Sequence, residues 1–380
     1  MGLTQNILVT GGAGFIGSNL SNKLVLRGHF VRVLDSLAPQ IHGDNPALSS
    51  LYNSLDSRIE FVHGSVTNSD DMMLALRGID TVVHLAAETG TGQSMYSIRH
   101  YNDVNIAGTA LLLDLISNLR YPVKKIVVAS SRAIYGEGKY LCSGHGTVYP
   151  KERKADALKA GDFEMHCPEC DDVLTMQLTD ENSMLNPNSI YGITKLSQEQ
   201  MVLTVGKALG ISAIAYRYQN VYGPGQSLHN PYTGILSIFS TRILNGNPVN
   251  IFEDGKESRD FVYIDDVVDV TLKGIEFEPE IVTALNVGSG VPTDVLSVAN
   301  TLKHLLNINV PIEVSGNYRI GDIRHNVADL TRISLMLGYK PSVLFDEGIR
   351  KFIHWVQGQK IHQDRYEESI IELRSKGLFK

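Results

Sequence analysis

Short apolar runs alternate with longer amphipathic stretches through the first half of the chain. The apolar runs predict strands at 6–10, 30–34, 59–62, 81–85 and 125–130. The amphipathic stretches predict helices, among them 15–27, 69–77 and 101–118. Strands separated by such helices indicate βαβ units, and therefore a parallel sheet with helices on both faces.

The pattern continues after an interruption. A helix is expected at 189–209, then a strand at 211–217, and residues 284–287 have the character of one more strand of the same sheet. Between these parts, residues 137–185 show little periodicity and suggest an insertion. Beyond residue 220 the pattern is irregular and rich in turn signals, which predicts a second, smaller lobe. The predicted main domain comprises 1–136, 186–220 and 255–290, the insertion 137–185, and the second lobe 221–254 and 291–380.

Length and composition narrow the class of protein. The chain has 380 residues, 43% of them hydrophobic and 20% charged, which is ample for a sizeable core. A net charge of −7 argues against binding to nucleic acid or to an anionic membrane. No apolar run approaches the roughly 20 residues of a membrane helix, and a strand begins almost at once, so we expect no leader and a cytoplasmic location.

A glycine-rich turn follows the first predicted strand. Gly11 permits the tight turn, Gly14 lets a pyrophosphate approach the backbone, and Gly17 allows the following helix to pack closely. The free N–H groups of that helix favour phosphate. Asp35 ends the next strand, where its carboxylate would accept hydrogen bonds from a ribose and repel a 2′-phosphate. The alternative, a plain turn and a surface Asp, does not explain why both features stand between a predicted strand and a predicted helix. We therefore expect tightly bound NAD. The expected fold is a Rossmann-type α/β fold: a doubly wound parallel sheet with a smaller mixed α/β C-terminal substrate lobe and a cysteine-containing insertion.

Tyr191 and Lys195 are four residues apart on a predicted helix and therefore share a face. An ammonium group beside a phenol lowers the pKa of the phenol, so Tyr191 could act as a general base near neutral pH. The spacing alone is common by chance, but here it lies downstream of a dinucleotide motif. Ser131 follows a buried strand, at the sheet edge where ligands bind in this architecture, and its hydroxyl could share a hydrogen bond with the substrate.

Several segments together resemble the extended short-chain dehydrogenase/reductase family, and most nearly its NAD-dependent sugar-nucleotide epimerases. They are TGGAGFIGS, HLAA, NIAGT, SSRAIYG, YGITK, RYQNVYGPGQ and SRDFVYIDDV, which span nearly the whole chain except the insertion. The resemblance implies a nucleotide-sugar substrate, a homodimer formed through the helices at 101–118 and 189–209, and Ser131, Tyr191 and Lys195 as the catalytic residues.

The resemblance also implies two sets of binding residues. The cofactor set is Gly11, Gly14, Phe15, Ile16, Gly17, Asp35, Ser65, Leu85, Ala86, Ala87, Asn105, Tyr191 and Lys195. The substrate set is Ser94, Ser131, Arg132, Asn220, Arg259 and Arg324. The chain departs from the family pattern at Ser65, where many relatives have an Asp, and at Arg132, where a small residue is usual.

The type of reaction follows from what the motifs lack. Dehydratases and decarboxylases of the family carry an Asp or Glu at the position of Ala133, and two-base epimerases use an active-site cysteine that is missing from 89–95. The remaining residues suit transient oxidation of a sugar hydroxyl, most simply at C4, followed by hydride return. The loop ETGTGQSMY and the insertion resemble those of dTDP-L-rhamnose 4-epimerases. A CDP-sugar 2-epimerase, a nucleotide-sugar 4-ketoreductase and a non-catalytic NAD sensor remain alternatives.

All three cysteines lie in the insertion, too few and too clustered for a secreted disulfide framework. Cys142 and His145 form a C-x-x-H pair, and Cys167 and Cys170 form a C-x-x-C pair. Three thiolates and one imidazole make a closed tetrahedral site for structural zinc, which a segment with so few apolar residues needs in order to fold. His166 could replace His145 as a ligand, and free thiols in a flexible loop are the other alternative.

Overall fold

The computed structural model describes residues 4–228, 230, 232, 234–361 and 363–380. Its centre is a seven-stranded sheet in the order β13-β9-β5-β4-β1-β2-β3, with every neighbouring pair parallel. The strands are β1 Asn6–Thr10, β2 Phe30–Asp35, β3 Glu60–His63, β4 Thr81–His84, β5 Lys125–Ser131, β9 Ser212–Tyr218 and β13 Val282–Val287. The order reverses direction between β1 and β4, which confirms the predicted doubly wound sheet.

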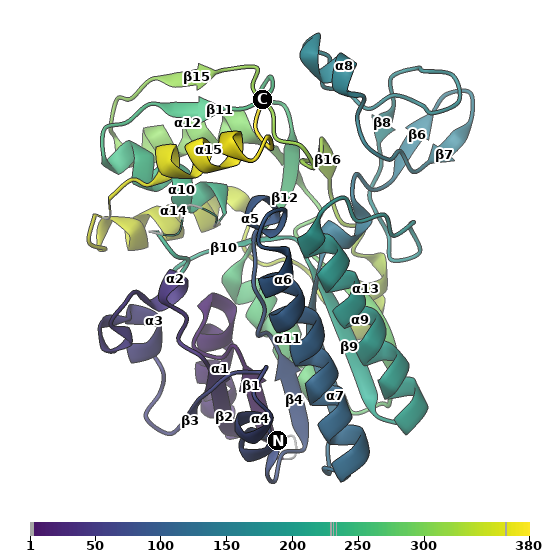
Figure 1. The fold of residues 1–380 in the computed structure, drawn as a ribbon, viewed down its shortest axis with the longest axis vertical. Coiled ribbons are helices and arrows are strands. Elements are labelled where there is room, and N and C mark those ends of the chain that lie inside the picture. Colours follow the sequence, from purple (N-terminus) through teal and green to yellow (C-terminus); the bar gives the residue numbers. More distant parts are fainter. Residues whose placement is uncertain (1–3, 229, 231, 233, 362) are drawn as a thin grey trace.

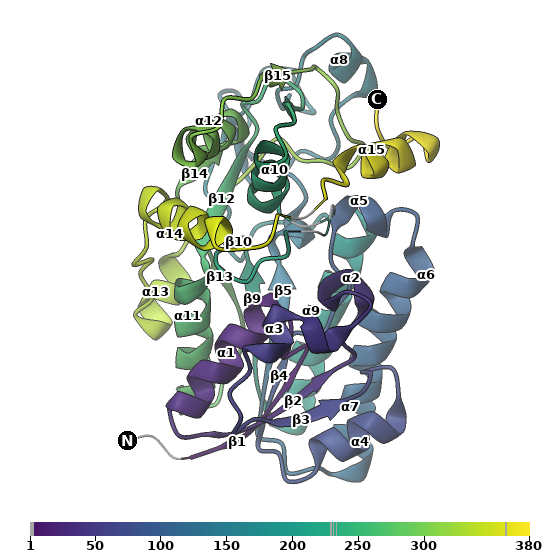
Figure 2. The ribbon, with the colours of Figure 1, turned by 90° about the vertical axis from the view of Figure 1, so that its left-hand side faces the viewer.

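Helices cover both faces of this sheet (Figures 1 and 2). Helices α1 (Phe15–Leu26) and α11 (Ile264–Glu276) pack on one face, and α4 (Ser69–Leu76), α7 (Gly108–Leu119) and α9 (Ile190–Leu209) on the other. Side chains of β1 alternate between the two cores: Ile7 and Val9 join one apolar cluster and Leu8 the other. This two-sided burial explains why the strands read as continuous apolar runs.

The helix predicted at 101–118 is one continuous spiral of three parts. It starts as α6 (Ile98–Tyr101), widens into a π-helix over Asn102–Ala107 and continues as α7. Such π segments interrupt α-helices mostly at functional sites. Here the widened turn carries Asn105, which is fully buried.

The second lobe covers the carboxyl ends of the main strands (Figure 2). Its strands are β10 Asn220–Tyr222, β12 Ser258–Tyr263, β14 Pro292–Asp294 and β16 His325–Asn326 in one sheet, and β11 Val249–Ile251 and β15 Ile312–Val314 in another. Its helices are α10 Ile235–Leu244, α12 Val295–Leu306, α14 Phe345–Gln357 and α15 Tyr366–Ser375. Helix α13 (Thr331–Leu337) lies within the range assigned to this lobe but packs on β13 and α11 of the main domain. Short helices complete the chain: α2 Pro39–His42, α3 Ser50–Asn53, α5 Thr91–Ser94 and α8 Ala155–Lys159.

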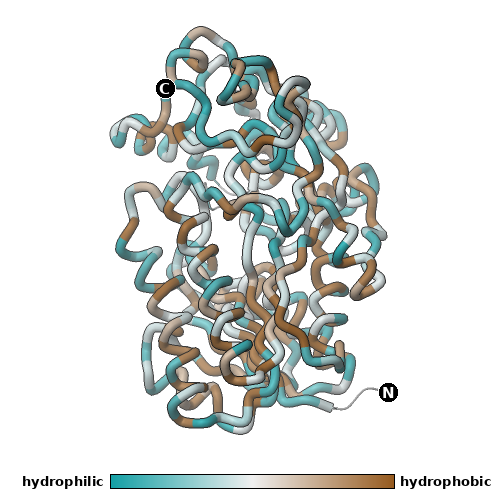
Figure 3. The backbone as a smooth tube through the Cα atoms, turned by 90° about the vertical axis from the view of Figure 1, so that its right-hand side faces the viewer, coloured by the Kyte–Doolittle hydropathy of each residue, from teal (hydrophilic) through white to brown (hydrophobic). Residues whose placement is uncertain are grey.

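The insertion forms a small unit of its own beside the second lobe (Figure 1). Strands β6 (Tyr140–Cys142), β7 (Gly146–Val148) and β8 (Thr175–Met176) make an antiparallel sheet in the order β7-β6-β8. Its hydrophobic core is a small cluster of Tyr140, Cys142, Met165, Cys167 and Leu174. In contrast, hydrophobic segments concentrate in the main sheet and its helices (Figure 3). No helix among the described residues is long and apolar enough to cross a membrane.

Candidate active site

One large cavity lies between the carboxyl ends of the main strands and the second lobe. Its volume is about 1370 Å³, and it is lined by the glycine turn, by the ends of β2, β4 and β5, and by residues of α10 and α15. Pockets for one small ligand usually measure roughly 300–1,000 Å³. The cavity therefore has room for two ligands, such as a dinucleotide and a second nucleotide.

The glycine turn has the shape that a dinucleotide requires. Gly11 has φ +68°, and a Cβ there would lie 2.7 Å from the backbone nitrogen of Ala86. A Cβ on Gly17 would lie 2.2 Å from the carbonyl oxygen of Gly11, so helix α1 can approach the turn only with glycine at this position. Gly14 caps α1 without a side-chain hydrogen bond, which leaves the helix N–H groups free for phosphate.

Asp35 lines the cavity at the end of β2 and also shapes the turn. Its carboxylate accepts hydrogen bonds from the backbone N–H of Ala13 at 3.0 Å and of Leu37 at 2.9 Å. Most of the expected cofactor residues line the same cavity: Gly11, Gly14, Phe15, Ile16, Gly17, Asp35, Ser65, Leu85, Ala86, Ala87, Tyr191 and Lys195. A dinucleotide therefore fits these residues as a group.

Of the expected binding residues, Asn105 and Ser94 do not reach the cavity. Asn105 is fully buried, and its amide exchanges hydrogen bonds with the backbone of Glu88 and donates to Thr194. Ser94, expected to bind substrate, is also fully buried, and its hydroxyl accepts a hydrogen bond from the backbone N–H of Tyr191 at 3.1 Å. The positions of these two residues correct the sequence expectation. Their short side chains form hydrogen bonds with the protein beside the cavity and are not available to a ligand.

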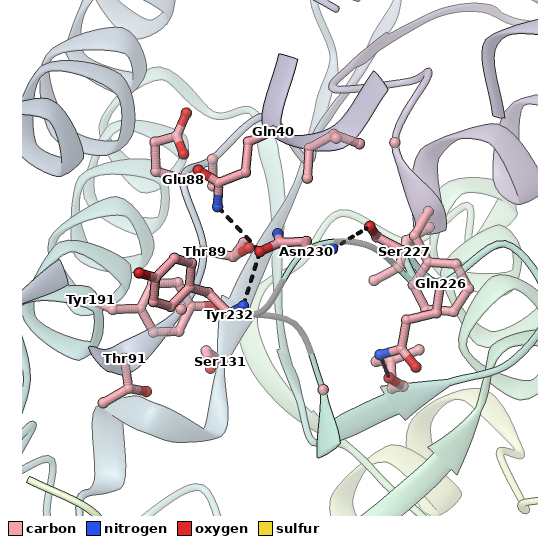
Figure 4. Close-up of a pocket in the computed structure, with 18 of the residues that line it drawn as sticks. Gln40, Glu88, Thr89, Thr91, Ser131, Tyr191, Gln226, Ser227, Asn230 and Tyr232 are labelled. Atoms are coloured by element: carbon pink, nitrogen blue, oxygen red, sulfur yellow. Dashed lines mark hydrogen bonds between the residues drawn. The ribbon is translucent and has the colours of Figure 1, made fainter. Parts of the chain in front are cut away.

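Helix α9 brings Tyr191 and Lys195 to the cavity wall beside Ser131. The hydroxyl of Ser189 caps the helix by accepting from the N–H of Gly192 at 3.1 Å. Because a Cβ on Gly192 would lie 2.7 Å from the carbonyl oxygen of Ala133, glycine lets α9 approach the segment that follows Ser131. Figure 4 shows the ring of Tyr191 and the side chain of Ser131 at the same part of the cavity.

The electrostatics of this pair differ from the sequence expectation. Burial raises the pKa of Tyr191, while the hydrogen bond of Ser131 and the charge of Arg132 lower it by less. The Nζ atom of Lys195 donates to the carbonyl oxygen of Ala129 at 2.8 Å and to the side-chain oxygen of Gln198 at 2.9 Å. Burial lowers the pKa of Lys195 itself to about 7. In the protein alone, Ser131 and Arg132 therefore favour the phenolate.

Three of the expected substrate residues, Arg132, Asn220 and Arg259, line the cavity with Ser131. The guanidinium of Arg132 donates to the side-chain oxygen of Asn220 at 3.1 Å. Its neighbour Ala133 brings no carboxylate, and none of the three cysteines lines the cavity. The wall thus offers cationic and amide groups that can hold an anionic ligand beside Tyr191.

Arg324 does not line the cavity, which corrects the prediction that it binds substrate phosphate. Its side chain is fully buried and its guanidinium is paired with Asp254, Glu253 and Glu164. Five residues earlier, Arg319 does line the cavity, where Asp322 lies 2.8 Å from its guanidinium. Spacing within the segment RIGDIR could not tell which arginine faces the ligand, because no regular helix or strand spans the two.

A polar contact across the cavity was also missed by the sequence reasoning. Gln40 donates to the side-chain oxygen of Asn230 at 3.4 Å, which also accepts from the N–H of Tyr232 (Figure 4). The contact joins the segment after β2 to the second lobe. No local motif marks either residue, since their meeting depends on how the lobes pack.

The insertion brings Cys142, His145, Cys167 and Cys170 together, with all four ligand atoms within 4.8 Å of one another. The Sγ atom of Cys142 lies 3.5 Å from Nδ1 of His145 and 3.6 Å from Sγ of Cys170. Tetrahedral zinc with bonds of about 2.1–2.3 Å places neighbouring ligand atoms about 3.6–3.8 Å apart. His166, the alternative ligand, instead contacts Asp162 and the carbonyl oxygen of Asp171.

The fold and the cavity define an enzyme of the dinucleotide-binding α/β class with a Ser-Tyr-Lys site. The family model for the NAD dependent epimerase/dehydratase family matches residues 7–154 and 168–288. The chain belongs to this family of NAD-dependent nucleotide-sugar epimerases. The gap between the two matched ranges, 155–167, lies inside the insertion, and residues 289–380 lie beyond the match.

Known relatives agree with this assignment. The chain is 36% identical to dTDP-L-rhamnose 4-epimerase of Burkholderia thailandensis over 93% of this chain and 95% of that protein. Among solved structures, UDP-glucose 4-epimerase of Thermotoga maritima with UDP-glucose superimposes with a TM-score of 0.75, at 29% identity and over 93% and 99% of the two chains. UDP-glucuronic acid 4-epimerase of Bacillus cereus, in complex with UDP-glucuronic acid and NAD, gives a TM-score of 0.75 at 26% identity over 93% and 99%.

Proposed function

We propose that this chain binds NAD tightly and inverts C4 of a nucleotide sugar, with dTDP-L-rhamnose as its substrate. The observation that carries the proposal is the meeting of Ser131, Tyr191 and Lys195 with the glycine turn around one cavity. The cavity has room for a dinucleotide and a nucleotide sugar together. The relative at 36% identity, a dTDP-L-rhamnose 4-epimerase, supports the choice of nucleotide and sugar.

Each residue of the site has a part in the reaction. Tyr191 takes the proton of the sugar hydroxyl and later returns it, while the Ser131 hydroxyl bonds the same sugar oxygen. Bound NAD would supply the hydride acceptor and donor, so that the alcohol is oxidised transiently to a ketone and reduced on its opposite face. Lys195, four residues after Tyr191 on α9, also lines the cavity and would help to hold the cofactor. Because Ala133 supplies no acid or base, elimination of water or of carbon dioxide is disfavoured.

Beside the acidic residues Glu257 and Asp322, the cavity wall carries arginines that suit the diphosphate of the substrate. Arg259 and Arg319 both line it, and a guanidinium matches phosphate oxygens with two parallel hydrogen bonds. The alternatives that use the same residues are a CDP-sugar 2-epimerase and a 4-ketoreductase. A ketoreductase would consume reduced cofactor with each turnover, whereas an epimerase would need none added.

The test is a panel of dTDP-, UDP-, CDP- and GDP-sugars incubated with the purified protein and followed by NMR. We expect the C4 epimer of dTDP-L-rhamnose without added cofactor. Tyr191→Phe should lose at least about 100-fold in kcat, because the phenol is the only proton acceptor proposed for the hydroxyl, and should still retain NAD. Turnover unchanged in Tyr191→Phe would reject the proposed base, and inversion of C2 of a CDP-sugar alone would favour the alternative.

We also infer one structural zinc ion per chain, bound by Cys142, His145, Cys167 and Cys170. The ligand spacing supports a tetrahedral site, and the insertion has too small an apolar core to hold its shape otherwise. Elemental analysis of protein purified without chelator should give one zinc per chain. A zinc-free, fully folded protein would reject the site.

A homodimer is proposed through α6, α7 and α9, which lie side by side on one face of the molecule (Figure 1). These helices expose Ile98, Leu119, Ile193 and Leu209, each 45% exposed or more. Sedimentation should find two chains per particle, and Ile193→Glu should shift the equilibrium toward single chains. A single-chain particle at every concentration would reject this arrangement.

A further inference from the structure

The insertion reaches the second lobe through a buried arginine. The side chain of Arg153 is 3% exposed. Its guanidinium donates to the carbonyl oxygen of Phe163 at 3.2 Å inside the insertion and to that of Asp322 at 3.0 Å in the lobe. It also pairs with Glu253 at 2.7 Å. Arg153 thus ties the backbone of both units together.

A second link runs through Glu164, eleven residues after Arg153 in the sequence. Its carboxylate contacts the fully buried guanidinium of Arg324, which is also paired with Asp254 at 2.7 Å. The side chain of Glu164 is 39% exposed, and Arg324 also pairs with Glu253 at 3.2 Å. The insertion therefore contributes one of the three acidic partners that hold Arg324 in place.

Both links end on the segment 319–324, which forms part of the cavity wall. Arg319 contacts the carboxylate of Asp322, and both residues line the cavity. Arg259 donates to the carbonyl oxygens of Ile323 at 2.8 Å and Arg324 at 3.0 Å. Arg153 therefore binds the same backbone segment, 319–324, that positions Arg259 and Arg319 in the cavity wall.

One of the proposed metal ligands is close in sequence to the second link. Cys167 is three residues after Glu164, and between them the carbonyl of Met165 accepts the N–H of Leu174 at 2.8 Å. The N–H of Cys167 donates to the carbonyl of Asp172 at 2.8 Å, which closes the knuckle. Two of the five buried core residues of the insertion are themselves metal ligands, so zinc binding and the fold of this unit are coupled.

We propose that the zinc-bound insertion is a brace for the cavity wall: it holds Arg153 and Glu164 against 319–324 and so sets the affinity for the diphosphate of the substrate. The inference rests on the proposed function and on the proposed zinc site. Arg153 and Glu164 are positioning residues, since neither lines the cavity. Loss of the brace should weaken diphosphate binding and leave proton transfer at Tyr191 intact.

The experiment measures dTDP binding by calorimetry, and kcat and KM with dTDP-L-rhamnose, on the NAD-bound full chain. Cys170→Ser should lose zinc and weaken dTDP binding about tenfold, with KM raised, kcat within twofold and NAD content unchanged. Glu164→Gln should keep its zinc and weaken dTDP binding about fivefold, because one charged hydrogen bond becomes neutral. The matched control is Asp156→Asn on α8, whose surface pair with Lys159 faces solvent.

The outcomes separate the brace from the proposed function. If Glu164→Gln binds dTDP with the same affinity as Asp156→Asn, the brace is rejected, whether or not Cys170→Ser folds. A fall in kcat with unchanged dTDP affinity would also reject it. A wild-type chain that binds dTDP but converts no sugar rejects the proposed reaction while the binding series still tests the brace. A chain that binds neither dTDP nor UDP rejects both.

Discussion

Replacing Lys195 by Met should change how the stability of the protein depends on pH. The Lys195 ammonium is buried, and burial lowers its pKa to about 7 from an ordinary value near 10.5. Between these two values the unfolded chain binds the proton and the folded chain does not, so stability rises with pH across this window. Below pH 7 both states carry the proton and the slope from this residue vanishes.

The size of the effect follows from the same shift. From pH 7 to pH 9 the folded state goes from half to almost fully deprotonated while the unfolded state stays protonated, which amounts to about 2 kcal/mol of added stability. Lys195→Met removes this gain. The difference in unfolding free energy between the wild type and the variant should therefore increase by about 2 kcal/mol in favour of the wild type between pH 7 and pH 9. The charge-to-methyl change keeps the length of the side chain and so limits cavity effects.

The assay is urea unfolding at pH 7, 8 and 9 with the same saturating NAD, and the slope with pH is compared. Lys207→Met on the same helix is the matched control, because Lys207 is exposed. It should follow the wild type at every pH. Parallel pH dependence of the wild type and Lys195→Met would refute the claim that a buried, easily deprotonated ammonium faces this site.

Three further changes test other parts of the structure. Glu199→Leu leaves the buried guanidinium of Arg217 without its partner at 2.6 Å and should lower the unfolding free energy in urea by about 3–5 kcal/mol, whereas loss of the partly exposed Glu276 should cost less than about 1. Gly17→Ala places a methyl group 2.2 Å from a backbone oxygen of the turn. The NAD content of the purified variant should therefore be about tenfold lower than that of the wild type, or lower still. Asp35→Asn removes the charge that repels a 2′-phosphate, and equilibrium binding should show NADP gaining on NAD by about tenfold; an unchanged ratio would reject that role.

The sequence predicted those parts of the molecule that are determined by residues close together in the chain. Strands of the main sheet are short apolar runs because both faces are covered, and the glycine turn is fixed by steric limits at Gly11 and Gly17. The convergence of Cys142, His145, Cys167 and Cys170 also followed from spacing, because each pair is a tight local turn and a common metal can join them.

Tertiary packing decided what the sequence could not. Arg319 and Arg324 have the same chemistry, but only the path of the chain between them turns one into the cavity and buries the other. Asn105 and Ser94 lie beside the site and were mistaken for ligand contacts, although their hydrogen bonds go to the backbone and, for Asn105, also to the side chain of Thr194. The direction of the Tyr191 pKa was wrong in the sequence reasoning because burial, which dominates it, depends on distant residues.

The central claim is that hydride leaves and returns to one sugar carbon at a site where Tyr191 handles only the hydroxyl proton. The direct measurement is conversion of dTDP-L-rhamnose labelled with deuterium at C4, in ordinary water, followed by NMR of the product. We predict the C4 epimer with its deuterium retained at C4 and no label lost to solvent. A product in which solvent hydrogen has replaced the deuterium would contradict the account, as would a product unchanged in configuration at C4.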